Sequence, residues 1–244
     1  HPRWGSPRIY EGLRKRGWTV NHKRVERLWQ EEGMQVPKKQ QKRRRRTLGG
    51  SENSCVRKRA LRPNHVWSYD FIEDRTEKNR KLRMLVVLDE FTRESLAIEV
   101  AWSWTARQVV DVLGYLFAVR GAPEHLRSDN GPEFVARAVT RWLHRAGVET
   151  LFIAKGSPWE NGYVESFNSR FRDELLNREL FTGLEDDRWV VDRWRLDYNH
   201  HRPHSSLNYL TPAAFAARWL ASAPQVTSAT PQQPAPLRQA SETH

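Results

Sequence analysis

The chain has 244 residues, including 11 Trp, and a formal net charge of +12 with a sequence pI near 10.2. That length allows one core of ordinary domain size, and the excess of Lys and Arg favours a polyanionic partner. No apolar run approaches the roughly 18 residues that a membrane span needs, and no apolar signal-peptide segment is present. The single cysteine, Cys55, excludes an internal disulfide and most structural zinc sites, so we expect a cytoplasmic protein. The chain begins at His1 rather than Met, as expected of a fragment or of the second part of a longer product.

Residues 6–33 predict two helices joined by a short turn. Ser6 is expected to cap the first helix, and Gly17 follows its end. Asn21 is expected to cap the second helix, which Gly33 closes. This is helix-turn-helix geometry, and the alternative is a plain helical hairpin with a solvated basic face. The side chains of the second helix that suit DNA contact are Lys23, Arg24 and Arg27.

The segment after these helices is strongly basic. Seven of the nine residues from 38 to 46 are Lys or Arg, without apolar periodicity, which predicts a linker with non-specific affinity for phosphate. Its candidate DNA-binding residues are Lys42, Arg43, Arg44, Arg45 and Arg46. The tail from residue 222 is rich in Pro, Ala, Gln, Ser and Thr, and we expect it to be disordered.

Strands and helices follow in a recognisable order from residue 63 onward. Strands are expected over 66–72, 82–89, 94–101, 124–128 and 150–154. Helices are expected over 105–120, over 134–146, from about 161 through 175, between 184 and 198, and over 212–219. Three strands in a meander, followed by alternating helix and strand, predict a mixed sheet covered by helices. Bulky residues on both faces of 66–72 indicate a central strand.

Three acids occupy settings that would hold a carboxylate in place. Asp70 lies in the middle of an expected strand, where a lone charge is costly unless it is paired. Asp129 follows another strand and opens the turn Asp-Asn-Gly-Pro. Glu165 lies in a helical pattern whose apolar residues are Val164, Phe167, Phe171 and Leu175. The neighbouring polar face of that helix carries Asn161, Glu165, Asn168 and Arg172.

The three acids lie mid-strand, at a strand end and on a helix face, which are elements that can converge at one edge of a sheet. Three carboxylates provide the hard oxygen ligands that suit Mg²⁺, and they would raise one another's pKa unless cations lay among them. Spacing alone carries little weight, because acids fill 29 of the 244 positions. The alternative is a paired strand acid, a turn acid and a solvated helix residue. Glu133 and Glu160 flank the site and are alternative ligands.

Three histidines near the C-terminus offer another candidate site. His200, His201 and His204 would suit a zinc patch. The other interpretation is that they pack or form hydrogen bonds beneath the core and help Arg202 to reach phosphate.

Several motifs resemble the insertion-sequence-three family of bacterial transposases. Tyr69-Asp70-Phe71, Ser-Asp-Asn-Gly-Pro-Glu-Phe at 128–134 and the segment 156–168 carry the resemblance, which is closest to the second reading-frame product with its retroviral-integrase-type catalytic core. Residues 1–33 resemble that family's helix-turn-helix segment, cut short upstream, and 198–207 resembles its C-terminal extension. The match covers about residues 1–220.

The resemblance implies a ribonuclease-H-like α/β core with a mixed five-stranded sheet and flanking helices, preceded by the small helix-turn-helix segment. It implies that Asp70, Asp129 and Glu165 form the acidic triad. The family's basic residue after the glutamate falls on Arg172; the corresponding position contacts the DNA end in related integrases, and the alternative is an ordinary surface arginine. The chain lacks the His-His-Cys-Cys zinc module of retroviral integrases.

We expect five segments on this basis. They are a helix-turn-helix segment at 1–36, a basic linker at 37–62, the catalytic core at 63–182, a C-terminal helical extension at 183–221 and a disordered tail at 222–244.

The expected reaction is phosphoryl transfer with two Mg²⁺ ions, for which Mn²⁺ can substitute. Water cleaves a phosphodiester at the end of the element, and the 3′-hydroxyl that remains attacks a second phosphodiester. Asp70 is expected to bridge both ions. Expected partners are double-stranded DNA (element ends and target), further copies of the chain on DNA and an upstream reading-frame product, in the bacterial cytoplasm at the nucleoid. The alternatives are a catalytically silent DNA-binding remnant or regulator, and a stand-alone nuclease of the same fold.

Overall fold

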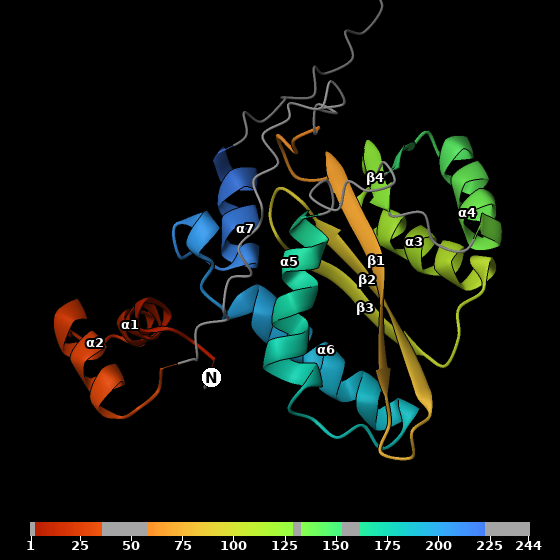
Figure 1. The fold of residues 1–244 in the computed structure, drawn as a ribbon. Coiled ribbons are helices and arrows are strands. Elements are labelled where there is room, and N and C mark those ends of the chain that lie inside the picture. The colour runs from red at the N-terminus through yellow and green to blue at the C-terminus, as the bar shows by residue number, and fades with distance from the viewer. Residues whose placement is uncertain (1–2, 36–57, 129–132, 153–161, 223–244) are drawn as a thin grey trace, which may run out of the picture.

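The computed structural model describes residues 3–35, 58–128, 133–152 and 162–222. Two N-terminal helices, α1 (Ser6–Lys15) and α2 (His22–Glu31), lie beside a larger body in which helices cover a five-stranded sheet (Figure 1). Asp129, Asn161 and the basic segment 42–46 lie outside the described residues, as do the tail from 223 and the flanking Glu160. No helix in the described part of the chain has the length and apolar character needed to cross a membrane.

The two N-terminal helices follow the predicted pattern, with one correction. Asn21 caps α2, because its Oδ1 accepts a hydrogen bond from the backbone N–H of Lys23 at 2.9 Å. The prediction that Ser6 caps α1 is wrong. The carbonyl of Gly5 already accepts the first bonds of the helix, from the N–H groups of Arg8 and Ile9, so Gly5 is the capping residue and Ser6 is buried within the first turn.

The sheet has the order β3-β2-β1-β4-β5, which confirms the mixed sheet and the central place of β1. β1 pairs antiparallel with β2 and parallel with β4, so both of its edges are covered. β2 pairs antiparallel with β3, and β4 pairs parallel with β5. The strands span Val66–Arg75 (β1), Lys81–Asp89 (β2), Ser95–Ala101 (β3), His125–Ser128 (β4) and Glu149–Phe152 (β5).

Helices cover both faces of the sheet and create two apolar cores. One core lies between the sheet and the helices α5 (Gly162–Phe171) and α6 (Leu184–His200). The other lies between the opposite face and the helices α3 (Ala106–Arg120) and α4 (Glu133–Arg145). The short helix α7 (Pro212–Ser222) follows, and the Oγ1 of Thr211 accepts a hydrogen bond from its third residue, as an N-cap should.

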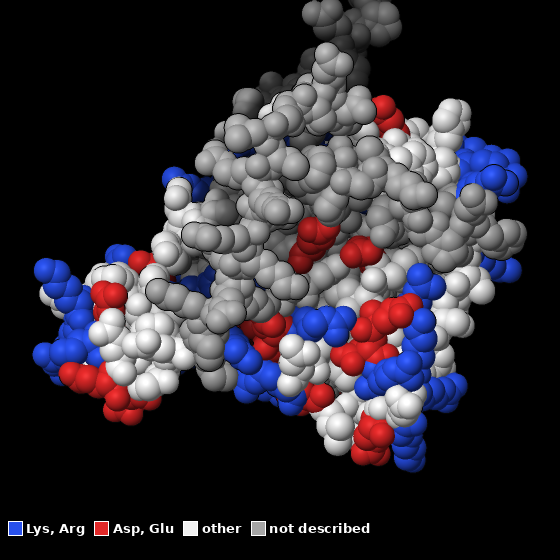
Figure 2. Space-filling view, in the orientation of Figure 1, with Lys and Arg blue, Asp and Glu red and all other residues white. Residues whose placement is uncertain are grey.

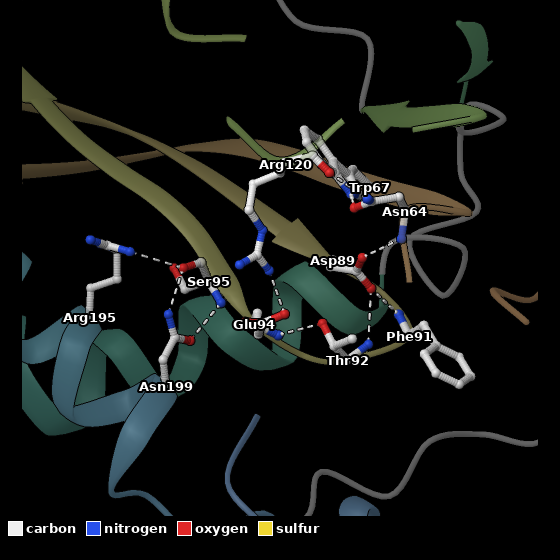
Figure 3. A network of polar contacts seen from close by, with 10 residues as sticks. All are labelled: Asn64, Trp67, Asp89, Phe91, Thr92, Glu94, Ser95, Arg120, Arg195 and Asn199. Atoms are coloured by element: carbon white, nitrogen blue, oxygen red, sulfur yellow. Dashed lines mark hydrogen bonds and ion pairs between the residues drawn. The ribbon is translucent and has the colours of Figure 1, made fainter. Parts of the chain in front are cut away.

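The turn between β2 and β3 ties several elements together (Figure 3). Asp89 accepts the N–H groups of the turn that follows it, and its other oxygen accepts the N–H of Asn64 at 2.8 Å. At the far side of the turn, the guanidinium of Arg120 from α3 lies 2.6 Å from the carboxylate of Glu94. These bonds join the turn to the residues just before β1 and to the C-terminal end of α3, so the turn holds α3 against the sheet.

A side chain from α6 forms hydrogen bonds with the backbone of the edge strand β3. Asn199 accepts a hydrogen bond from the N–H of Ser95 and donates one to the carbonyl of Ser95, both at 2.9 Å (Figure 3). The amide therefore pairs with the start of β3 as a neighbouring strand would, and it holds α6 against the sheet. Asn199 belongs to the Tyr-Asn-His-His segment, which the sequence placed at the end of this helix.

Candidate active site

Asp70 lies half-buried near the middle of β1, and both of its carboxylate oxygens are held in place. Oδ1 accepts the backbone N–H of Phe71 at 2.8 Å, and Oδ2 accepts the side-chain Nδ2 of Asn168 at 2.7 Å. The acid expected to need a partner thus has one, 98 residues away in the chain. Asn168 lies on α5, so this hydrogen bond fixes α5 against the central strand.

Glu165 lies on the polar face of α5, as the spacing of apolar residues predicted. Val164, Phe167 and Phe171 are fully buried in the core beneath the helix, whereas Glu165 is exposed. Glu165 lies three residues before Asn168, which places it about 60° from Asn168 around the helix axis and one turn earlier. The exposed carboxylate therefore lies on the same side of α5 as the amide that binds Asp70.

Asn168 has one further property that bears on cation binding. Its amide oxygen, Oδ1, is buried and lacks a hydrogen-bond partner among the described residues. A buried oxygen without a donor is costly, and hard oxygens of this kind are ligands for Mg²⁺ or for the water bound to it. Asp70 and the Asn168 oxygen are thus hard oxygen donors of the kind that Mg²⁺ prefers, and Glu165 lies on the same side of α5.

Arg172 lies four residues beyond Asn168 and contacts the same strand. Its Nη2 donates to the backbone carbonyl of Glu73 at 3.0 Å, and the residue is exposed. The predicted continuous helix through Leu175 is wrong at this point: α5 ends at Phe171, and residues 172–176 form one π-helical turn, η2 (Arg172–Leu176). The N–H of Asn177 bonds back to the carbonyl of Arg172 in this wider turn.

The second acid of the predicted triad follows β4 directly in the sequence. β4 runs parallel to β1, with Arg127 paired to Ser68, and it ends at Ser128. The strand therefore ends beside the stretch of β1 that leads into Asp70, and the next residue in the sequence is Asp129. The N-terminal residue of α4 is Glu133, the flanking acid considered as an alternative ligand.

The predicted DNA-contacting residues of α2 are available to a partner. Lys23, Arg24 and Arg27 are exposed, and Arg27 also pairs with Glu31 at 3.4 Å. Figure 2 shows Lys and Arg side chains along the outer edge of the N-terminal helices. Acidic side chains show at the centre of the same face, where α5 lies beside β1.

The three C-terminal histidines do not converge. His200 and His201 are exposed, whereas His204 is buried and its Nε2 lies 3.0 Å from the hydroxyl of Tyr198. Burial, together with Arg202 and other nearby guanidinium groups, lowers the pKa of His204 to about 3, so this ring is neutral. His204 packs beneath the core as one of the two interpretations predicted.

A different histidine cluster lies at the start of β1 and β4, and no pattern in the sequence indicated it. Ligand atoms of His65, Glu124 and His125 lie within 4.8 Å of one another. The backbone N–H of Leu61 donates to Nδ1 of His65 at 3.0 Å, so the neutral ring carries its proton on Nε2, which faces Glu124 at 3.4 Å. An Nε2 that carries a proton cannot bind a metal, and Arg62 already pairs with Glu124.

Charge around this cluster supports the same conclusion. Burial lowers the pKa of His65 and of His125, and neighbouring cations lower it further, Arg62 at His65 and Lys58 at His125. His125 Nδ1 lies 2.9 Å from Glu149. The cluster is thus a paired network of side chains that joins the start of two strands.

Family comparisons agree with this arrangement. Residues 60–158 and residues 146–212 each match an integrase core domain family, and residues 1–45 match a family of HTH-like domains. Together the matches span α1, α2, the whole sheet and the helices through α6.

Two relatives in insertion elements cover most of the chain. An uncharacterised 31.7 kDa protein of insertion element IS407 from Burkholderia multivorans is 40% identical, over 91% of this chain and 78% of the relative. The transposase InsF of insertion sequence IS3A from Escherichia coli is 28% identical, over 90% of this chain and 78% of the relative.

The fold also resembles that of a viral integrase. The catalytic core domain of HTLV-2 integrase, solved in complex with magnesium, has a TM-score of 0.52 at 18% identity, and the likeness covers 65% of this chain and 99% of that domain. The sheet and its flanking helices therefore have the ribonuclease-H-like fold of integrase cores. With two integrase-core matches and a 40% identical insertion-element relative, the chain belongs to the insertion-sequence-three family and is a DNA transposase, a polynucleotidyl transferase.

Proposed function

We propose that Asp70, Asp129 and Glu165 form the catalytic triad of this transposase, and that it cleaves element ends and transfers strands by 3′-hydroxyl attack. One observation carries the proposal: the 2.7 Å hydrogen bond between Asn168 and Asp70. It joins the helix that carries Glu165 to the strand that carries Asp70. The parallel strand β4 ends beside the same stretch of β1, one residue before Asp129.

We further propose that the triad holds two Mg²⁺ ions, for which Mn²⁺ can substitute. The donors fit such ions, because Asp70 is fixed at both oxygens, Glu165 is exposed and the amide oxygen of Asn168 is unsatisfied among the described residues. When bound, the metal would lower the pKa of an attacking hydroxyl and stabilise the leaving oxygen. The chain's own part is to orient: Phe71 and Asn168 fix the plane of the Asp70 carboxylate, and Arg172 is anchored to the carbonyl of Glu73 one turn farther along.

DNA is the proposed partner of the basic surfaces. Lys23, Arg24 and Arg27 on α2 suit phosphate or groove contacts, and Arg172 suits the DNA end. Asn161, Asn168 and the basic residues 42–46 complete the proposed set. An element has two ends, so the proposal includes a homo-oligomer assembled on DNA, at the bacterial nucleoid, and an upstream reading-frame product as a further partner.

A strand-transfer assay with Mg²⁺ tests the triad. Asp70→Ala, Asp129→Ala and Glu165→Gln should each abolish strand transfer while DNA binding persists, because each removes a carboxylate and leaves the basic surfaces unchanged. Glu99→Gln is the matched control, since Glu99 is an exposed acid on the edge strand β3, two strands from Asp70 and on the opposite face of the sheet. Strand transfer at the wild-type rate in any triad variant would contradict the assignment.

The alternative function is a catalytically silent DNA-binding remnant or regulator. It predicts DNA binding by the wild-type chain without any strand transfer. A crystal grown with Mn²⁺ distinguishes the two, because an enzyme should show Mn²⁺ between the three acids and a remnant should show none.

Arg172 has a test of its own. Arg172→Ala should weaken binding to element ends. It should also reduce the slope of log K against log salt by roughly 0.9, the value expected for the loss of one phosphate contact to duplex DNA. Unchanged binding would identify Arg172 as an ordinary surface arginine.

A further inference from the structure

Arg202 is the most deeply buried charged residue of the C-terminal segment. It is 1% exposed, and its Nε and Nη2 atoms bind the carboxylate of Glu174 at distances from 2.5 to 3.1 Å. Glu174 lies in the π-helical turn η2, directly after the helix that carries Glu165. The pair therefore links the segment after α6 to the end of the catalytic helix.

Two further arginines join this pair from other parts of the chain. Arg8 comes from α1, and its Nε donates to the carbonyl of Pro203, the neighbour of Arg202, at 3.2 Å. Arg170 lies on α5, one turn before Glu174, and its Nη1 donates to the carbonyl of Ser166 at 2.8 Å. Arg8, Arg170 and Arg202 form what we call the arginine cluster. It lies where the N-terminal helices meet the catalytic body; Figure 1 shows α1 between α2 and that body.

The arginine cluster carries more positive than negative charge. In the described part of the chain, one of its three guanidinium groups, that of Arg202, has an ion pair with a carboxylate, that of Glu174, and Asp197 lies 3.7 Å from His201. Burial lowers the pKa of Arg8 to about 10, and the charge of Arg202 adds to this effect. A partly buried excess of positive charge is costly unless an anion offsets it.

An unused donor points to the same missing partner. Nη1 of Arg202 is buried and has no hydrogen-bond partner within the described ranges. A buried, charged N–H without an acceptor costs more than a neutral one. Arg8 and Arg170 are only half-buried, so an anion can reach the cluster from solvent. The planar fork of a guanidinium matches the oxygens of a phosphate better than those of most other anions.

We propose that the arginine cluster binds a backbone phosphate of DNA at the junction between the N-terminal helices and the catalytic body. Arg170 lies five residues after Glu165 on α5, which is about 140° around the helix and 7.5 Å along it. Arg170 therefore lies on a different side of α5 from Glu165, and the bound phosphate lies outside the catalytic face. Because Arg8 belongs to α1 and Arg170 to α5, one phosphate would fasten the DNA-binding helices to the helix that carries Glu165.

Two variants and one control test this site in the full chain. Arg8→Gln and Arg170→Gln each remove one charge from the cluster and leave the buried Arg202–Glu174 pair intact. Arg107→Gln is the matched control, because Arg107 is an exposed arginine at the start of α3, on the opposite face of the sheet. The first measurement is the thermal unfolding midpoint in sodium phosphate against sodium chloride at equal ionic strength. Phosphate should raise the midpoint of the wild type and of Arg107→Gln, and this increase should be smaller in the two cluster variants, which keep only the general stabilisation by excluded phosphate.

The second measurement separates DNA phosphate from the free ion. Binding of a mixed-sequence duplex is followed by fluorescence anisotropy over a salt series, and each cluster variant should lower the slope of log K against log salt by about 0.9. Arg107→Gln should leave the slope unchanged. Each variant is compared with itself across salt, so a modest loss of stability does not affect the result.

Each outcome decides the proposal. A phosphate effect reduced in the cluster variants, together with a reduced slope, supports it. A reduced phosphate effect with an unchanged DNA slope would assign the cluster to a free oxyanion and overturn it, as would phosphate effects and slopes equal to those of the wild type. Both readouts are independent of catalysis, so they hold in Glu165→Gln and remain informative even if the triad assignment fails.

Discussion

The two ends of the β1–β4 pair both gather polar side chains, but they differ in how fully those side chains are paired. At the start of the strands, His65 faces Glu124 at 3.4 Å and His125 faces Glu149 at 2.9 Å. Further along, Glu165 is exposed and the amide oxygen of Asn168 is buried without a partner in the described part of the chain. We call these the paired end and the open end.

The difference shows that ligand-like spacing is a weaker sign of function than an unsatisfied donor set. The paired end has histidine and carboxylate atoms within 4.8 Å of one another, as a metal site would. Its acids are nevertheless already paired with cations, Glu124 with Arg62 and Glu149 with Lys58, and the neighbouring buried Glu90 is paired with Arg127 at 2.9 Å. Among the described residues, the open end has an exposed carboxylate at Glu165 and a buried amide oxygen without a donor at Asn168, and such oxygens are what a divalent ion or a phosphate-metal complex can use.

The largest expected effect is at the paired end. Glu90→Gln should lower the free energy of unfolding by about 3–5 kcal/mol, because it leaves the buried guanidinium of Arg127 without its counter-charge. Urea unfolding measures the change. Glu99→Gln, at an exposed position, should stay within about 0.5 kcal/mol of the wild type. A loss below about 1 kcal/mol for Glu90→Gln would show that the pair does little for stability.

The next effect is at the open end and concerns activity. Asn168→Ala should reduce strand transfer by about 10- to 100-fold, because the carboxylate of Asp70 loses the group that orients it. Single-turnover strand transfer at saturating Mg²⁺ is the measurement. Asn177→Ala, an exposed asparagine just after η2, is the matched control. Equal loss in both variants would point to a general loss of stability at the end of α5.

Metal addition distinguishes the two ends directly. Mg²⁺ at ten times its dissociation constant should raise the free energy of unfolding of the wild type by about 1.4 kcal/mol, because it binds the folded chain and not the unfolded chain. Glu165→Gln should lose this stabilisation, whereas His65→Gln should retain it. The measurement is the unfolding midpoint with and without Mg²⁺. Retained stabilisation in Glu165→Gln would place the ion elsewhere.

The smallest effect is a pH dependence at the paired end. The pKa values of His65 and His125 are lowered in the folded chain, mainly by burial, so the unfolded chain takes up protons first as the pH falls. Their contribution to stability is complete above the unfolded pKa near 6.5 and declines below it, by under about 1 kcal/mol per histidine at pH 6. Urea unfolding at pH 7.5 and pH 6 in the wild type and in a His65→Gln/His125→Gln double variant measures it. The double variant should show the flatter pH dependence, and equal slopes would contradict the assignment.

Local patterns in the sequence determined most of the secondary structure. Asn21 and Gly17 mark helix ends by their own chemistry, and the spacing of Val164, Phe167 and Phe171 set the phase of α5. The prediction that Ser6 caps α1 was wrong because a serine before a proline is typical of a cap, whereas the carbonyl of the preceding Gly5 accepts the first hydrogen bonds of the helix. The π-helical turn at 172–176 was not predictable, since a helical pattern continues through it. Within this turn Leu175 and Leu176 are buried in the core and Glu174 pairs with the distant Arg202.

By itself, the sequence determined the elements, the exposed side of α5, the family resemblance and the identity of the candidate triad, because caps, periodicity and motifs act over a few residues. Only the tertiary structure decided which distant groups meet. Asn168 reaches Asp70 across 98 residues and Arg8 reaches Pro203 across 195. Such pairs depend on the order of strands in the sheet and on how helices pack against it, and no local pattern encodes them. For the same reason the histidines that gather at the paired end gave no signal in the sequence.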